Sequence, residues 1–313
     1  MLGAPAERLA SEHDDTFRLA GDDGVARLLK ISAARAPARA VGSPGFQTAL
    51  LLHLARVAPE LPVQRVIATL GRLNIALRGF THPGARWTHL WDLQNFWALR
   101  PLLDRLPESG MLPSVGRALA ADGRAPDGPA VDGSLELREL VPGGLRAALV
   151  DCLDRFDAVV RPALASVATQ VIHADFHGEN LLADGGRITG ILDFGDALAG
   201  PVAMDVGQAA CYQLGACGPG GDLIAPALDV VAGYHAVDPL SDADLDLVAE
   251  FIVARVAARI IVSQSNAARD PANSGYLLRR TPQAVAHLAA LRALPPVEIG
   301  RRLRAACRLE VVG

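Results

Sequence analysis

Lysine is almost absent from this sequence. The chain has 313 residues and 30 basic side chains, of which only Lys30 is a lysine and the rest are arginines. Where arginine replaces lysine almost everywhere, the remaining lysine is a candidate for a task that a guanidinium performs poorly. The 34 acidic side chains give a net charge of −4. The chain therefore lacks the basic field of a nucleic-acid binder, and we expect no nucleic-acid partner.

Cysteines and long apolar runs are also scarce. The four cysteines form no C-x-x-C pair, so nothing indicates a zinc ribbon or a disulfide framework: they are Cys152, Cys211, Cys217 and Cys307. The most apolar run, 251–262, is interrupted by Arg255 and Arg259 and is too short to span a membrane. Residues 1–15 hold no apolar stretch of the secretory-signal type. We expect a cytoplasmic protein with no membrane partner.

The first part of the chain has a β-rich pattern. Residues 16–20 and 25–31 resemble short strands, and Gly-Asp-Asp-Gly at 21–24 is a strong turn signal between them. Apolar residues at helical spacing predict a helix over 46–57, and a third strand is predicted over 64–69.

The remainder is mostly helical in pattern. A segment at 171–193 has a strand–loop–strand–turn–strand pattern, and 107–144 is rich in Gly, Pro and Asp. Helices are predicted over 88–105, 145–168 and from 203 to the end, with one strand-like run at 135–141. This order favours an α+β fold of two lobes, a β-rich lobe at 1–70 and a larger helical lobe at 71–313.

The densest polar segment lies within the strand–loop–strand region. His173 and Asp175 follow one apolar run, Asn180 follows five residues later, and Asp193 ends the next apolar run. Such a loop brings Asp175, Asn180 and Asp193 to one place. A carboxylate can orient a hydroxyl and accept its proton, and amide and carboxylate oxygens are hard ligands for Mg²⁺. The segment therefore predicts phosphoryl transfer, with a structural hairpin bearing surface carboxylates as the alternative.

These motifs resemble a known superfamily. The pattern H-x-D-x-x-x-x-N of His173, Asp175 and Asn180, followed by I-L-D-F-G-D at 191–196, is similar to the aminoglycoside phosphotransferase and choline kinase-like superfamily, relatives of the protein kinases. The resemblance implies a two-lobe protein-kinase-like fold with Asp175 as catalytic base and His173 as the residue that braces its loop. It also implies that Asn180 and Asp193 hold Mg²⁺ and that Asp205 braces the catalytic loop.

Lys30 has a place in the same resemblance. Such kinases carry a small-lobe strand lysine against the nucleotide phosphates, and Lys30 lies within the apolar stretch 28–31. An ammonium approaches phosphate as a point charge, which the forked guanidinium does not. No Gly-rich phosphate loop is present, so the segment from Ser11 to Thr16 would cover the phosphates of ATP or GTP. The alternative for Lys30 is an exposed strand lysine.

Scattered blocks indicate one branch of the superfamily. The stretches 11–19, 79–83 and 271–276 resemble hydroxylysine kinase-like proteins. This implies transfer of the γ-phosphoryl of ATP or GTP to a hydroxyl of an amino-acid-like or amino-alcohol substrate, with 5-hydroxylysine as the best guess. Such a zwitterion needs an acidic group, for which Asp196 is a candidate, and an arginine. Arg255 and Arg259 are candidates for that arginine, although salt bridges along a helix explain them as well.

The sequence also departs from the superfamily. The strand and hinge expected after Thr69 are missing, although residues 135–144 resemble them and would restore the hinge by an unusual route. The helix over 47–58 offers no acidic partner for Lys30. An aminoglycoside or other amino-alcohol phosphotransferase and a catalytically impaired pseudokinase are therefore the alternatives. A zinc site through His173 and His177 would need a helix there, which the adjacent Gly178 disfavours.

Overall fold

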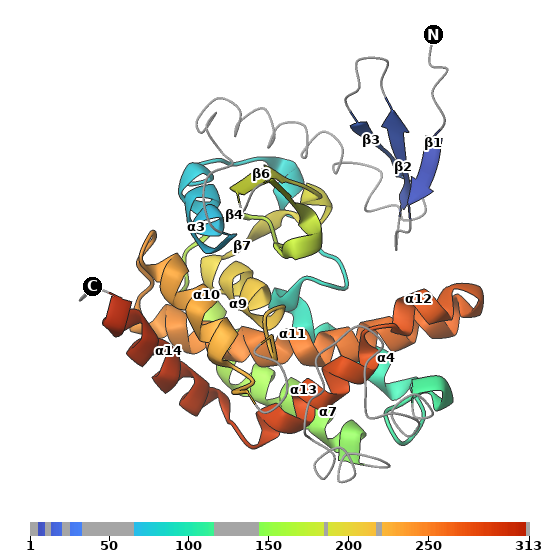
Figure 1. The fold of residues 1–313 in the computed structure, drawn as a ribbon. Helices are drawn as coiled ribbons and strands as arrows, with labels where there is room; N and C mark the ends of the chain where they lie inside the picture. Colours follow the sequence, from blue (N-terminus) through green and yellow to red (C-terminus); the bar gives the residue numbers. More distant parts are fainter. Residues whose placement is uncertain are drawn as a thin grey trace. The chain divides into compact units, whose positions relative to one another are not determined.

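The structure is a computed structural model of the chain (Figure 1). It describes three strands at 6–9, 14–20 and 26–32, and the residues 66–115, 144–184, 187–216 and 221–310. The chain divides into two compact units, residues 1–44 and 45–313, and each is described by itself. The predicted helix at 46–57 and the hinge-like strand at 135–141 lie outside the described residues. The predicted lobe boundary at residue 70 stays a prediction.

The first unit contains a three-stranded antiparallel sheet in the order β1 (Ala6–Leu9), β2 (Asp14–Ala20) and β3 (Ala26–Ser32). The predicted hairpin is confirmed as β2–β3, and β1 was not predicted because its four residues carry no alternation of apolar and polar side chains. The register places Thr16 directly opposite Lys30. Two of the predicted nucleotide-site residues are thus neighbours in one sheet.

The predicted strand at 64–69 is wrong, because helix α3 (Val66–Ala76) begins there. The helix starts with the β-branched residues Val66 and Ile67, which favour a strand when only a few neighbouring residues are considered. Leu70, Leu73 and Leu77 then recur at helical spacing, are almost completely buried, and α3 packs on α10 (Ala225–His235). Tertiary burial of this apolar face outweighs the local strand preference.

Helix α11 (Asp242–Arg269) forms the centre of the second unit (Figure 1). It begins at a capping box of Ser241 and Asp244, and it packs against α9 (Val202–Cys211), α13 (Thr281–Arg292) and α14 (Pro296–Glu310). The helices α9 and α11 approach closely at Gly207, where an added Cβ would lie 2.7 Å from Cβ of Phe251. The helical pattern predicted for this part of the chain is confirmed, and α11 contains the apolar run 251–262. None of the helices in the described part is both long and apolar enough to cross a membrane.

The other predicted helical regions are largely confirmed. The stretch 145–168 forms α7 (Gly144–Arg155), a π-helical turn (Phe156–Val160) and α8 (Arg161–Leu164). The aromatic stretch at 88–105 is mainly a 3₁₀ helix (Leu93–Leu99) that starts at the N-cap Asp92 and continues into α4 (Arg100–Asp104). Short 3₁₀ turns (Pro83–Ala85, Pro271–Asn273) and α12 (Ser274–Leu278) complete the described helices outside the segment that carries the polar motif.

Two small antiparallel pairs carry the polar motif. Strand β4 (Thr169–Ile172) pairs with β7 (Leu198–Pro201), and β5 (Leu181–Asp184) pairs with β6 (Arg187–Ile191). The predicted strand–loop–strand–turn–strand order is confirmed, whereas β7 was not predicted. Because β7 leads directly into α9, the motif is attached to the helical core on which α11 also packs.

Candidate active site

The loop after β4 and the open end of the β5–β6 hairpin lie together. Leu181 pairs with Ile191, so Asn180 and Leu192 face each other at the hairpin end, where the Leu192 N–H donates to the Asn180 carbonyl at 2.7 Å. Asp193 is the next residue along the chain. The strand pairing therefore brings Asn180 and Asp193 to neighbouring positions, as the sequence predicts.

His173 connects these two loops. Its ring is fully buried, Nδ1 accepts from the Asp175 N–H at 3.3 Å, and Nε2 lies 2.9 Å from the Leu192 carbonyl oxygen. The carbonyl contact needs the proton on Nε2, which leaves Nδ1 as the acceptor. Both ring nitrogens thus contact backbone, and His173 has the geometry of a positioning residue.

Asp205 holds the same loop from α9. Its carboxylate is fully buried and accepts from the Ala174 N–H at 2.9 Å and the His173 N–H at 3.4 Å. Ala174 has φ of 62°, a left-handed conformation that a non-glycine residue adopts only when its surroundings stabilise it. Burial raises the pKa of Asp205. These are the contacts that the resemblance implied for a loop brace.

Asp175 is surrounded by donors on both oxygens. Oδ1 accepts from the Tyr212 hydroxyl and from Nη2 of Arg255, each at 2.9 Å. Oδ2 accepts from Nδ2 of Asn180 at 3.1 Å and lies 3.3 Å from Nε2 of His177. Burial alone would raise the pKa of Asp175, but the hydrogen bond with His177 and the charge of Arg255 outweigh it and hold the pKa far below its usual range.

Three of these neighbours were not predicted as partners of Asp175. Arg255 comes from α11, lies 4.6 Å from the centre of the Trp91 ring and also donates to the Tyr212 hydroxyl at 2.6 Å. Tyr212 and His177 stack with ring centres 4.3 Å apart. The sequence contains one signal for these contacts, which is that Arg255 lies inside an apolar run. An arginine in such a run indicates that the side chain has a buried partner, but it does not identify the partner.

Asp193 adopts a left-handed conformation, with φ of 54°, and accepts from the Gly195 N–H at 3.2 Å. Aspartate tolerates this region better than most residues, and the turn directs the chain away from β6. Asp196, the candidate for a substrate amine, lies 3.8 Å from Nδ1 of His89. It therefore already faces a ring that carries positive charge when protonated.

The donor set fits a magnesium ion that is shared with phosphates. Nδ2 of Asn180 donates to the carbonyl oxygen and to Oδ2 of Asp175, so the amide oxygen is the atom of this side chain that would bind a metal ion. Within the described ranges, no three His, Cys, Asp or Glu side chains converge as a complete metal site. Mg²⁺ normally takes only one or two protein carboxylate or amide ligands and completes its shell with water and phosphate oxygens.

The nucleotide-side predictions fall in the first unit. Lys30 and Thr16 pair across β2–β3, and Ser11 lies outside the described residues. The unit is described by itself, so contact between Lys30 and the Asp175 region stays a prediction.

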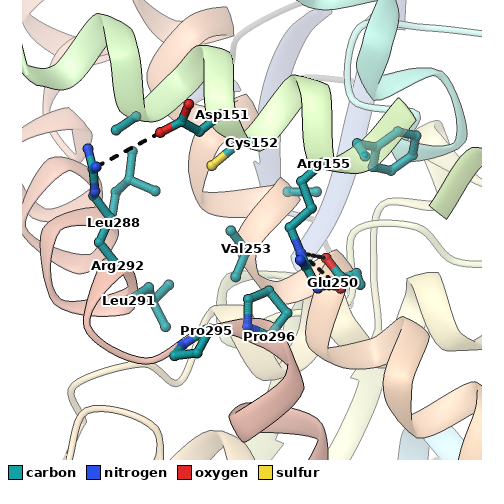
Figure 2. A pocket seen from close by; sticks show the side chains of 13 residues that line it. Asp151, Cys152, Arg155, Glu250, Val253, Leu288, Leu291, Arg292, Pro295 and Pro296 are labelled. Carbon is teal, nitrogen blue, oxygen red and sulfur yellow. Dashed lines mark hydrogen bonds and ion pairs between the residues drawn. The ribbon is translucent and has the colours of Figure 1, made fainter. Parts of the chain in front are cut away.

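A cavity lies elsewhere in the helical unit, between α7, α11, α13 and the turn before α14 (Figure 2). Figure 2 shows Arg155 directed at Glu250 and Arg292 directed at Asp151. Its charged groups therefore face one another, and burial raises the pKa of the Cys152 thiol to about 12. The cavity shares no lining residue with the Asp175 site.

The site has the arrangement of a protein-kinase-like phosphotransferase core. The Asp175 carboxylate lies on the loop between β4 and the hairpin, Asn180 and Asp193 lie beside it, and Asp205 of α9 holds the loop from the buried side. Residues 6–251 match the model of the phosphotransferase enzyme family, so the chain belongs to that family. Hydroxylysine kinase of Danio rerio is 28% identical over 155 residues, which are 48% of this chain and 43% of that protein. The chain therefore matches less than half the length of this curated relative.

Solved structures are similar over nearly the whole chain. A choline/ethanolamine kinase family protein from Mesorhizobium loti has a TM-score of 0.55 at 16% identity, covering 98% of this chain and 94% of its own. A microcompartment-associated aminopropanol kinase has a TM-score of 0.51 at 16% identity, covering 97% and 94%. These likenesses confirm the predicted α+β, two-lobe protein-kinase-like fold, and the predicted superfamily is also confirmed.

Proposed function

We propose that this protein is a Mg²⁺-dependent small-molecule kinase. It transfers the γ-phosphoryl of ATP or GTP to a hydroxyl of an amino-acid-like or amino-alcohol substrate, and 5-hydroxylysine is the first acceptor to test. The observation that supports this most directly is the convergence of Asp175, Asn180 and the Asp193 loop at one hairpin end. The match to hydroxylysine kinase supports the choice of acceptor.

Asp175 is the proposed base. Its Oδ1 accepts hydrogen bonds from Arg255 and Tyr212, which come from the helical core. Its Oδ2 contacts Asn180 and His177, which belong to the same loop as Asp175. Oδ2 is therefore the oxygen that we expect to receive the proton as the acceptor oxygen bonds to phosphorus. Phosphoryl transfer passes through a loose transition state, in which orientation of the acceptor hydroxyl by Asp175 contributes more than early proton removal.

The other predicted residues have supporting roles. Asn180 and Asp193 would hold Mg²⁺, which when bound neutralises charge on the phosphates. His173 and Asp205 fix the loop that carries Asp175. We assign the phosphate contact to Lys30, and the cover over the phosphates to Ser11 and Thr16, within a nucleotide lobe at 1–70.

Phosphorylation of a panel of hydroxylated amines with labelled ATP and GTP tests the proposal. The panel holds 5-hydroxylysine, simple amino alcohols and an aminoglycoside, so that the alternative amino-alcohol acceptors are scored together. Asp175→Asn should lower turnover about 100-fold or more, because general-base and orienting contributions are of that size. Turnover that survives in this variant would refute the role of Asp175.

Titration calorimetry with Mg-ATP and Mg-GTP separates a kinase from an impaired pseudokinase. Lys30→Arg retains the charge and should still weaken nucleotide use about tenfold or more, because charged hydrogen bonds contribute roughly 1.5–3 kcal/mol. The control is Arg27→Lys in the same strand. Absence of nucleotide binding at millimolar concentration would favour the pseudokinase.

A further inference from the structure

Two arginines of α11 lie one helical turn apart beside Tyr212. Arg255 and Arg259 are spaced i, i+4 and therefore share a face of the helix. Their guanidinium carbons lie 5.4 and 4.6 Å from the centre of the Tyr212 ring, whose hydroxyl donates to Asp175 at 2.9 Å. One cation thus contacts the proposed base directly, and the other is separated from it by a single aromatic ring.

The charges in this part of the site do not balance. Arg255 is paired with Asp175, whereas the half-buried Arg259 side chain forms neither an ion pair nor a hydrogen bond with any residue of the described ranges. Nε and Nη1 of Arg255, a side chain that is 4% exposed, also have no hydrogen-bond partner among those residues. A buried donor without a partner is unfavourable, so an acceptor group from a ligand would be favoured here.

We propose that this arginine pair binds a carboxylate of the acceptor substrate, with Arg259 making the direct contact. The inference rests on the proposed kinase function and narrows the acceptor class to hydroxylated amino acids. Guanidinium groups bind carboxylates through paired, charge-assisted hydrogen bonds. An acceptor with positive charges only, such as an aminoglycoside or a simple amino alcohol, would instead place a cation near Arg259 and be disfavoured.

The layout suits a substrate whose hydroxyl and carboxylate are a few carbons apart. Tyr212 separates the two ends, with Asp175 at its hydroxyl and Arg259 over its ring. The hydroxyl of an amino acid such as 5-hydroxylysine can therefore lie at the base while its carboxylate approaches Arg259. Arg255 contacts both Asp175 and Tyr212, so it fixes the position of the base relative to the carboxylate contact.

The test uses two compounds that differ only in the carboxylate, 5-hydroxylysine and its decarboxylated counterpart, 1,5-diaminopentan-2-ol. Both are assayed for kcat/KM with ATP, and their binding is measured by calorimetry with a non-hydrolysable ATP analogue. Arg259→Gln should lower kcat/KM and affinity for 5-hydroxylysine about 10- to 100-fold, and change the values for the diamine less than about threefold. Arg259→Lys should recover part of the loss, and Arg269→Gln, at the exposed end of the same helix, is the control.

The outcomes distinguish this inference from the proposed function. Equal losses for both compounds, or no loss for either, would overturn the carboxylate site while any remaining turnover still supported a kinase. Carboxylate-dependent binding without phosphorylation of either compound would support the site and overturn the kinase assignment. Failure of both compounds to bind at millimolar concentration would overturn the carboxylate site.

Discussion

Replacing Asp175 should destabilise the protein as well as inactivate it, because Asp175 forms a partly buried ion pair with Arg255. Asp175→Asn removes the only carboxylate that contacts Arg255 among the described residues, and Arg255 is 4% exposed. Removing one partner of a buried ion pair costs about 3–5 kcal/mol, because the remaining charge stays desolvated. The Tyr212 hydroxyl still accepts from Arg255, so we expect a value near 3 kcal/mol.

Arg255→Met in the same chain should restore most of this loss. Methionine fills similar space beside Trp91 and Tyr212 and removes the guanidinium that Asp175→Asn leaves without its counter-charge. The double variant should therefore be within about 1–2 kcal/mol of the original protein, which gives a coupling free energy of roughly 2–3 kcal/mol. Both the single Asp175 variant and the double variant should lack kinase activity, so stability and activity respond differently.

Urea unfolding followed by tryptophan fluorescence measures these free energies. The tryptophans, Trp87, Trp91 and Trp97, all belong to the second unit and so report on the unit that holds the pair. Asp157→Asn is the matched control, because Asp157 pairs with Arg161 at the surface and should cost less than about 1 kcal/mol. An Asp175→Asn protein as stable as the original, or additive effects in the double variant, would refute the reasoning.

Three further predictions concern the core around this site. Asp205→Asn replaces one of two buried acceptor oxygens with a donor that faces a backbone N–H, so it should cost about 2–3 kcal/mol in urea unfolding and lower kcat. Gly207→Ala should cost at least about 1–3 kcal/mol, because its Cβ would overlap Phe251, whereas Gly275→Ala, which has open space, should be nearly neutral by the same measurement. Burial and the charge of Arg259 lower the pKa of His287 to about 4. As pH falls from about 6.5 to 4, the unfolded chain therefore binds this proton before the folded chain does, and the folded state loses stability. His287→Leu should remove roughly 3 kcal/mol from the difference between the free energies of unfolding at pH 7 and pH 4, measured by urea unfolding.

Predictions based on short-range patterns were the most successful. The hairpin of β2 and β3 follows from its turn residues, and the order of β4, β5 and β6 follows from apolar runs interrupted by polar residues. The same short segment contains His173, Asp175 and Asn180, so the loop that holds the proposed base was identified without any long-range contact. The strand predicted at 64–69 was wrong, because the β-branched start of helix α3 resembles a strand until the packing of α3 on α10 is known.

The sequence by itself determined the superfamily, the α+β fold class and the position of the loop that carries the proposed base, because those features are encoded by residues close together in the chain. Only the tertiary structure decided which distant side chains surround Asp175. Arg255 is 80 residues away and Tyr212 is 37 residues away, and nothing local indicates that α9 and α11 place them on the same carboxylate oxygen. The structure also distinguishes the two arginines. Arg255 forms an ion pair with Asp175, whereas Arg259 has no counter-charge among the described residues. Such pairings depend on how helices pack, and helix packing is a property of the whole core.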